Sequence, residues 1–246
     1  MAGCWASFAG DCEGGASREH IVSRTLLGKT VRFKGFFNRS ERVIAVGRDS
    51  FVSKCLCRKH NTALSDCDSE MKKYQEAIRW YASGRQPGDG PDLEKRINGF
   101  RLAKWFAKTA CNIAVVSKKR LPIPFAKYAF AESDDPSIHF YFMAQPDDVL
   151  EVDRDPWEFH WLWDKDNPHR VAIVCYVLGF PFMLSSIDVR GAEAQVCEKL
   201  NIQTSNPQGI YEDRLNAINI GDGPSKRGAI IFDWSGSTVT YPAPPA

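Results

Sequence analysis

The sequence lacks several features that would each point to a particular class of protein. No run of about 18 apolar residues occurs, so no transmembrane helix and no membrane partner are expected. The longest apolar stretch, Val171 to Leu184, is interrupted by Gly179 and Pro181. The N-terminus lacks the basic-then-apolar order of a secretory signal, and we see no internal repeat. We therefore expect a cytoplasmic protein whose cysteines are thiols or metal ligands rather than disulfides.

An excess of charge of one sign is also missing, because the formal net charge is only +2. The distribution of charge is uneven, however. Residues 1–60 contain 11 Lys and Arg against 5 Asp and Glu, whereas the remainder contains 21 against 25. A locally basic first quarter on a near-neutral protein is typical of a surface that faces phosphate groups, so nucleic acid is the expected partner.

The pattern of apolar residues predicts an α+β fold in two parts, residues 1–84 and residues 92–246, separated by the Gly- and Pro-rich segment Gly84–Pro91. The first part begins with a small, Gly-rich loop. A β-hairpin is expected over 30–37 and 42–52, and Asn61 opens a helix with one apolar face.

A second helix is expected from Asp92 to about Asn112, followed by a mostly antiparallel, β-rich region. The expected strands are Ala126–Ala131, His139–Ala144, Trp157–Trp163, Val171–Leu178, Pro181–Ser185 and Ala229–Trp234. Short helices are expected at Ala192–Leu200 and Tyr211–Ala217.

Cysteines gather in the first 67 residues, where they suggest a metal site. Cys57 and His60 form a tight Cys-x-x-His pair, and Cys4 with Cys12 offers a second pair. Tetrahedral zinc accepts such a set, and a Gly-rich segment with little core of its own would gain stability from it. Cys55 is an alternative to Cys4 or Cys12, and the competing interpretation is reduced thiols beside a surface histidine.

Glu19, His20 and Asn61 are the candidate catalytic residues. Hydrolysis of a phosphodiester needs an activated water and a cation that offsets negative charge. His20 is the natural general base because its ordinary pKa is closest to neutrality. Glu19 and Asn61 offer the oxygen ligands that Mg²⁺ prefers. Adjacent strand residues point to opposite faces, so a bulge or turn near Gly14-Gly15 is needed to bring Glu19 and His20 together.

Three stretches together resemble the HNH endonuclease superfamily, whose active site is a ββα-metal finger. They are Ser17–Ser23, Leu56–Asn61, and Leu64-Ser65 with Asp68. The resemblance covers roughly residues 4–70. It implies an endonuclease module in the first part of the chain that acts on DNA, in its double-stranded form, with an accessory domain behind it.

The resemblance also implies a role for each site residue. Glu19 and Asn61 would bind a catalytic Mg²⁺ or Mn²⁺, and His20 would activate water. Cys4, Cys12, Cys57 and His60 would bind the structural zinc. The chain departs from the family in three ways: the interval between His20 and Asn61 is long, the middle asparagine is absent around Val52–Lys54, and His60 replaces a cysteine.

Two alternatives to a constitutive nuclease stay open at this stage. The first is a non-catalytic zinc-stabilised module that binds nucleic acid or protein, which the absent asparagine favours. The second is a nuclease gated by a small ligand of the β-rich part. A homodimer is also left open. In the β-rich part, the histidines and the aromatic stripe Trp157–Trp163 are expected to be structural, with base stacking as the minority interpretation of the stripe.

Overall fold

The computed structural model describes residues 3–34, 43–82, 94–133, 135–143, 157–163, 167, 169–177, 180–186, 211–213, 217–220 and 228–234. The expected linker Gly84–Pro91 and the expected helix Ala192–Leu200 lie outside these residues. The described α-helices are α1 (Arg58–Ala63), α2 (Ser65–Ala82), α3 (Gly99–Val116) and α4 (Ile123–Ala129). Three short 3₁₀ turns precede them: η1 (Ser7–Ala9), η2 (Arg24–Leu26) and η3 (Arg48–Ser50).

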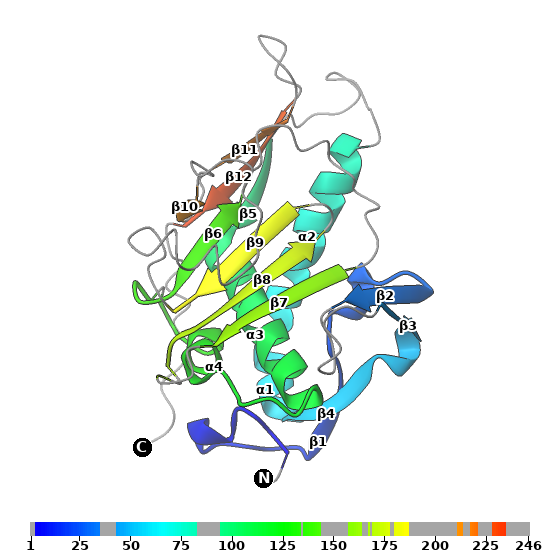
Figure 1. Ribbon diagram of the computed structural model, residues 1–246, viewed down its shortest axis with the longest axis vertical. Helices are drawn as coiled ribbons and strands as arrows, with labels where there is room; N and C mark the ends of the chain where they lie inside the picture. Colours follow the sequence, from blue (N-terminus) through cyan, green and yellow to red (C-terminus); the bar gives the residue numbers. More distant parts are fainter. Residues whose placement is uncertain are drawn as a thin grey trace.

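The described strands form three sheets (Figure 1). In chain order they are β1 (Ala16–His20), β2 (Thr30–Lys34), β3 (Ile44–Gly47), β4 (Val52–Cys57), β5 (Glu94–Asn98), β6 (His139–Met143), β7 (Trp157–Trp163), β8 (Val171–Val177), β9 (Phe180–Ser185), β10 (Tyr211–Asp213), β11 (Ala217–Ile220) and β12 (Gly228–Asp233). The seven-stranded sheet has the order β10-β6-β9-β8-β7-β2-β3, the three-stranded sheet β11-β12-β5, and β1 pairs with β4. Most pairs are antiparallel, as expected; β2 with β7 and β12 with β5 are parallel.

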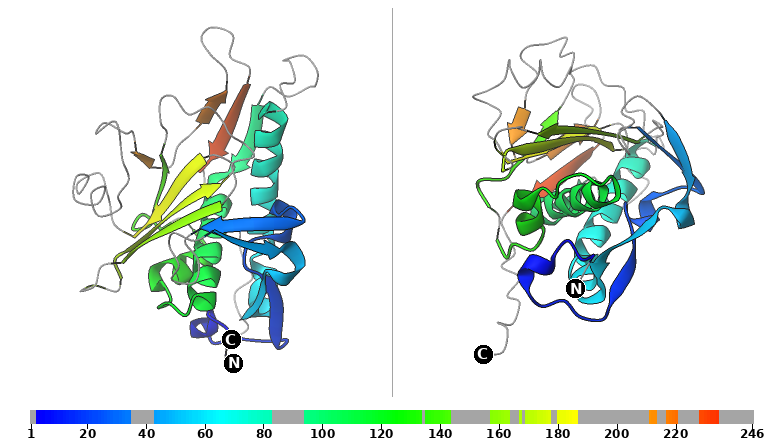
Figure 2. Two further views of the ribbon diagram at one scale, coloured as in Figure 1. Left: turned by 45° about the vertical axis from the view of Figure 1, so that its right-hand side comes forward. Right: turned by 60° about the horizontal axis from the view of Figure 1, so that its bottom comes forward.

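Helix α3 is the central element of the core. Fifteen of its residues, from Gly99 to Ala114, are buried. Helices α2 and α3 lie on one face of the large sheet (Figures 1 and 2). The ring of Phe106 packs against Phe140 and Phe182 of that sheet, at centroid distances of 5.1 and 5.2 Å. No helix in the described ranges is both long and apolar enough to cross a bilayer.

Several expected elements are confirmed. Strands β2 and β3 form the antiparallel hairpin. The apolar face expected after Asn61 is buried through Leu64, Cys67, Met71, Tyr74 and Ile78, and α2 packs on α3. The helix does not open at Asn61, however: α1 begins at Arg58, and Leu64 separates it from α2. The hairpin also extends the large sheet, since Phe33 and Lys34 of β2 pair with the first residues of β7.

Three sequence expectations are wrong. The second helix begins at Gly99, with Asn98 as its N-cap, because residues 94–98 instead pair with β12 as strand β5. In the segment expected to form a strand at Ala126–Ala131, the first four residues belong to α4, since a short apolar run fits either state and packing against α3 selects the helix. The segment expected to be helical at Tyr211–Ala217 supplies β10 and the start of β11, where edges of β6 and β12 offer backbone partners.

Candidate functional site

Three cysteines and one histidine converge near the N-terminus. The ligand atoms of Cys4, Cys12, Cys57 and His60 all lie within 4.8 Å of one another. The three sulfurs lie 3.4, 3.7 and 3.1 Å from His60 Nδ1. In a tetrahedral zinc site, sulfur and nitrogen ligands are about 3.5 Å apart, given the usual metal–ligand distances. The cluster can therefore hold a structural zinc ion.

Local backbone structure explains why these four residues meet. The chain turns back after η1 at Gly10, whose φ of 80° is in the left-handed region that favours glycine. This turn separates Cys4 from Cys12. The other two ligands share one helical turn, because the Cys57 side chain caps α1 and accepts a hydrogen bond from the His60 backbone N–H. A second backbone N–H, that of Cys57, donates to Cys4 Sγ at 3.3 Å.

Asp11, next to Cys12, directs the imidazole of His60. Asp11 Oδ1 lies 2.8 Å from His60 Nε2, and Lys59 Nζ lies 3.1 Å from the other carboxylate oxygen. A carboxylate can only accept here, so Nε2 carries the proton and the lone pair of Nδ1 faces the three sulfurs. This is the arrangement by which carboxylates orient metal-binding histidines.

The thiols of the cluster differ in acidity. Burial raises the pKa of Cys57, but backbone N–H groups, His60 and Cys4 outweigh it and lower this pKa to about 7. Burial and the neighbouring sulfurs raise the pKa of Cys12 to about 11. Cys55 is not part of the cluster: its thiol donates to Asn112 Oδ1 at 3.2 Å. Cys67, Cys111 and Cys175 are buried, as small core residues are.

Glu19, at the end of β1, belongs to a second polar group, which also contains Lys108 and Asp68. Its carboxylate is buried and contacts Lys108 Nζ of α3 at 2.9 Å. The same ammonium contacts Asp68 of α2 at 2.8 Å. Burial raises the pKa of Glu19 despite the opposing effect of Lys108. Burial disfavours the charge on Lys108, but Asp68 and Glu19 outweigh it and raise its pKa.

Asn61 joins the same group. Its side chain hydrogen-bonds the Glu19 carboxylate, and Asn61 Nδ2 donates to Ser17 Oγ at 3.2 Å. On the other side of Lys108, Ser23 Oγ donates to Asp68 and accepts a hydrogen bond of 2.7 Å from Trp105 Nε1. The sequence therefore identified two members of this group, and the fold adds Lys108, Asp68 and Ser23.

His20 has different neighbours from Glu19. Strand β1 is irregular between Ser17 and Glu19, and not at Gly14-Gly15 where a bulge was expected, and this irregularity does not bring the two side chains together. The charged groups around its ring are Arg18, Arg24, Arg48 and Asp49. His20 Nε2 is buried and has no hydrogen-bond partner among the residues that the structure describes. Burial lowers the pKa of His20, and Arg24 lowers it further, so the neutral imidazole is favoured.

The residues expected to bind Mg²⁺ or Mn²⁺ do not fit that ion in this arrangement. Glu19 and Asn61 do lie together, but the ammonium of Lys108 already contacts the Glu19 carboxylate. The amide nitrogen of Asn61 faces Ser17 as a donor. A divalent cation bound to Glu19 would lie next to the buried ammonium of Lys108, and the two positive charges would repel each other.

One sequence signal could have revealed the missing residues. Helix α3 is almost entirely apolar, yet Lys104, Lys108 and Asn112 recur every four residues along it and are all buried. Charged residues on one face of an apolar helix need partners. Lys104 Nζ donates to the Ala131 carbonyl at 2.8 Å, and Asn112 accepts from Trp5 Nε1 at 2.8 Å.

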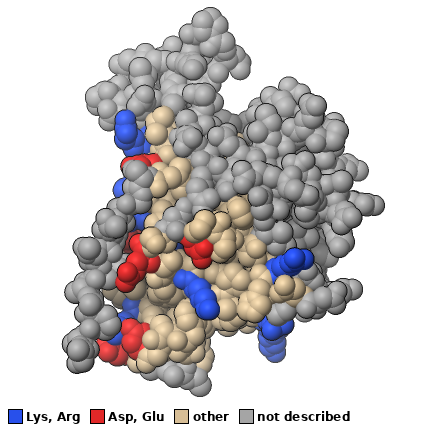
Figure 3. Space-filling view, turned by 90° about the vertical axis from the view of Figure 1, so that its left-hand side faces the viewer, with Lys and Arg blue, Asp and Glu red and all other residues tan. Residues whose placement is uncertain are grey.

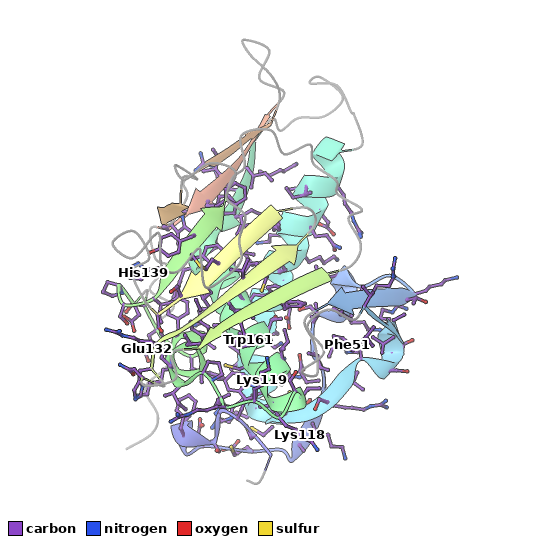
Figure 4. The ribbon with its side chains drawn as sticks, viewed as in Figure 1. Phe51, Lys118, Lys119, Glu132, His139 and Trp161 are labelled. Carbon is purple, nitrogen blue, oxygen red and sulfur yellow. The ribbon has the colours of Figure 1, made fainter. Side chains whose placement is uncertain are left out.

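The other candidate residues lie apart from this site. Figure 4 places His139 on the opposite side of the molecule from Phe51, whose carbonyl accepts from the backbone of Ile21. His169 is exposed in a turn. Lys119 lies over the ring of Trp161 at 5.9 Å, and Phe159 is part of the core, as expected. The side chains of Trp157, His160 and Trp163 are outside the described residues.

Figure 3 shows one face of the molecule, on which the acidic and basic side chains of the described residues are interspersed. Comparisons of the chain with protein-family models, with curated proteins and with solved structures gave no match.

Proposed function

We propose that this chain is an HNH-type endonuclease that hydrolyses phosphodiester bonds of DNA, with His20 as the general base. Strand β1 pairs antiparallel with β4, β4 is followed directly by α1, and the zinc ligands Cys57 and His60 lie at the junction of β4 and α1. This order of elements and the motifs in it support the resemblance to a ββα-metal finger. The three candidate residues lie at the end of β1 and in α1.

The environment of His20 carries the proposal. Its buried Nε2 has no partner among the described residues, so this nitrogen is free to accept a proton. Arg18, Arg24 and Arg48 surround it with positive charge, and Arg24 is well exposed, paired with Asp49 at 3.0 Å. Such a surface attracts a phosphodiester and places it beside a proton acceptor.

The chemistry that these residues supply is general-base catalysis. His20 Nε2 takes a proton from a water molecule, and the water oxygen bonds to phosphorus as the phosphorus–oxygen ester bond breaks. The leaving oxygen takes a proton from solvent. The arginines offset the negative charge that builds up on the phosphate oxygens.

The test is cleavage of plasmid DNA by wild type and by His20→Ala, with Mg²⁺ or Mn²⁺ present. We expect a loss of roughly 100-fold or more in His20→Ala, the usual contribution of a general base. His139→Ala, which changes a histidine remote from the site, should cleave like wild type. Equal cleavage by wild type and His20→Ala would rule out the catalytic role.

A second candidate function is a non-catalytic, zinc-stabilised module that binds nucleic acid. The observation that favours it is the buried pair of Glu19 with Lys108, which leaves the expected cation ligand neutralised. Such a module would bind DNA without added Mg²⁺ or Mn²⁺ and would cleave none. Its affinity would fall with rising salt and with Arg24→Ala, because the contacts are to phosphates.

A further inference from the structure

Lys108 is a buried cation held between two carboxylates. Its side chain is 3% exposed, and Nζ lies 2.9 Å from Glu19 Oε1 and 2.8 Å from Asp68 Oδ2. The three groups come from three elements, β1, α2 and α3, which are distant in sequence. Removing a charge from water is costly, so such a cation is stable only where its partners are fixed.

Both carboxylates are fixed by neighbouring side chains. Asn61 hydrogen-bonds Glu19 and itself donates to Ser17. Ser23, which accepts from Trp105, donates to Asp68 Oδ1. Glu19 Oε1 and the other Asp68 oxygen, Oδ2, both contact Nζ. The group is built around a cation position.

The ligands around this position are those of a divalent cation site. Carboxylate oxygens, two of which meet here, are ligands that Mg²⁺ and Mn²⁺ prefer. The ammonium contacts the carboxylates at 2.8–2.9 Å, whereas Mg²⁺ would need oxygens at about 2.1 Å. One ion position therefore accepts either Lys108 or a metal, since both together would place like charges in a buried site.

We propose that Lys108 is the resident cation of this site, so that its ammonium occupies the position of the divalent ion and the wild-type chain binds no Mg²⁺ or Mn²⁺ at Glu19. The inference rests on the proposed function only in taking Glu19 and Asn61 as the cation ligands. Lys108 itself is buried and does not contact a substrate. Its role is to hold Glu19 and Asp68, and with them the strand that ends in His20.

The experiment is titration of the metal-depleted but zinc-loaded protein with Mn²⁺, followed by electron paramagnetic resonance. The proteins are wild type, Glu19→Gln, Lys108→Met and the double variant Lys108→Met/Glu19→Gln, with Lys108→Arg as the charge-preserving control. We expect no Glu19-dependent binding in wild type or in Lys108→Arg. We expect Lys108→Met to bind one Mn²⁺ at least roughly tenfold more tightly than any non-specific, Glu19-independent binding by wild type, because two carboxylates are then free to bind it. The double variant should lose this binding.

Binding of Mn²⁺ by wild type that is lost in Glu19→Gln would overturn the proposal. So would failure of a folded Lys108→Met to bind, because Lys108 would then not be what excludes the metal. If Lys108→Met folds only when Mn²⁺ is added, the proposal is supported. If it does not fold at all, the comparison of wild type with Glu19→Gln decides. These readouts do not depend on cleavage, so an inactive wild type would contradict the proposed function and leave this result intact.

Discussion

Asp11 shows how one residue outside the metal cluster can determine its chemistry. The carboxylate orients His60 and fixes the tautomer that presents Nδ1 to the sulfurs. Its neighbour Glu13 contacts the same lysine, Lys59, at 3.3 Å but does not contact the imidazole. Substitutions at Asp11 and at Glu13 therefore distinguish the loss of a nearby negative charge from the loss of the group that orients His60.

Asp11→Asn should weaken zinc binding by roughly 10- to 100-fold, the usual effect of losing the group that orients a ligating histidine. Glu13→Gln removes a similar charge and should bind zinc like wild type. Competition against a coloured zinc chelator measures both affinities. Equal affinities for Asp11→Asn and wild type would show that the imidazole is held without this carboxylate.

At the scale of elements, the segment before β1 is held by the metal ligands, by the packing of Trp5 against Phe130 and by a few polar contacts. Trp5 N donates to the Cys55 carbonyl at 2.9 Å, and Trp5 Nε1 donates to Asn112 of α3. Arg58 N donates to the Gly15 carbonyl at 3.0 Å. We therefore expect this segment and the start of α1 to depend on zinc more than the large sheet does.

Removal of zinc by a chelator should increase amide hydrogen exchange at Trp5 and Arg58 while β8 and β9 stay protected, because metal-coupled folding is local here. Cys57→Ser should show the same pattern without a chelator. Cys67→Ser, a buried cysteine outside the cluster, should keep one zinc per chain by elemental analysis. Uniform loss of protection in every element would contradict a local role for zinc.

Gly99 lies where the first turn of α3 meets the end of the three-stranded sheet. A Cβ atom built on Gly99 would lie 2.5–2.7 Å from three atoms of the Trp234 indole. Real side chains do not approach this closely, so α3 and the residue after β12 can pack in this way only if residue 99 is glycine.

Gly99→Ala should therefore lower the free energy of unfolding by about 1–3 kcal/mol, the usual cost of overpacking. Gly47→Ala is the matched control, since the nearest atom to its added Cβ is Ser50 Oγ at 3.8 Å. Urea denaturation measures both. An unchanged midpoint for Gly99→Ala would mean that the indole moves aside at no cost.

At the scale of the whole molecule, the two parts of the chain share one core. The hairpin β2–β3 extends the sheet of the second part, and the ring of Phe33 lies 6.3 Å from Phe159 of β7. Helix α2 buries its apolar face on α3. The polar group around Lys108 also takes its carboxylates from the first part and its ammonium from the second.

A fragment ending at Gly84 should therefore fail to fold, even when zinc is supplied, because it exposes the apolar face of α2 and leaves Glu19 and Asp68 without Lys108. The amide proton NMR spectrum of the fragment should be poorly dispersed, and that of the zinc-loaded full chain should be well dispersed. A well-dispersed spectrum for the fragment would establish residues 1–84 as an independent domain, as the sequence predicts.

Local chemistry was readable from the sequence. The Cys-x-x-His pair, the second cysteine pair and the apolar spacing of α2 depend on neighbours within a few residues or on a metal that selects particular side chains. The hairpin at β2–β3 and the strands β6–β9 likewise follow from short-range patterns.

Long-range pairing decided the rest. Residues 94–98 and 211–220 are strands because distant edges supply hydrogen-bond partners, and Ala126–Ala129 is helical because α3 packs against it. The same holds for the site: Glu19 and Asn61 stood out as cation ligands, but the cation that faces them is Lys108, 89 positions further along the chain than Glu19. No local pattern specifies such a partner, since a buried charge is placed by the packing of α3 against β1 and α2 and not by its neighbours in sequence.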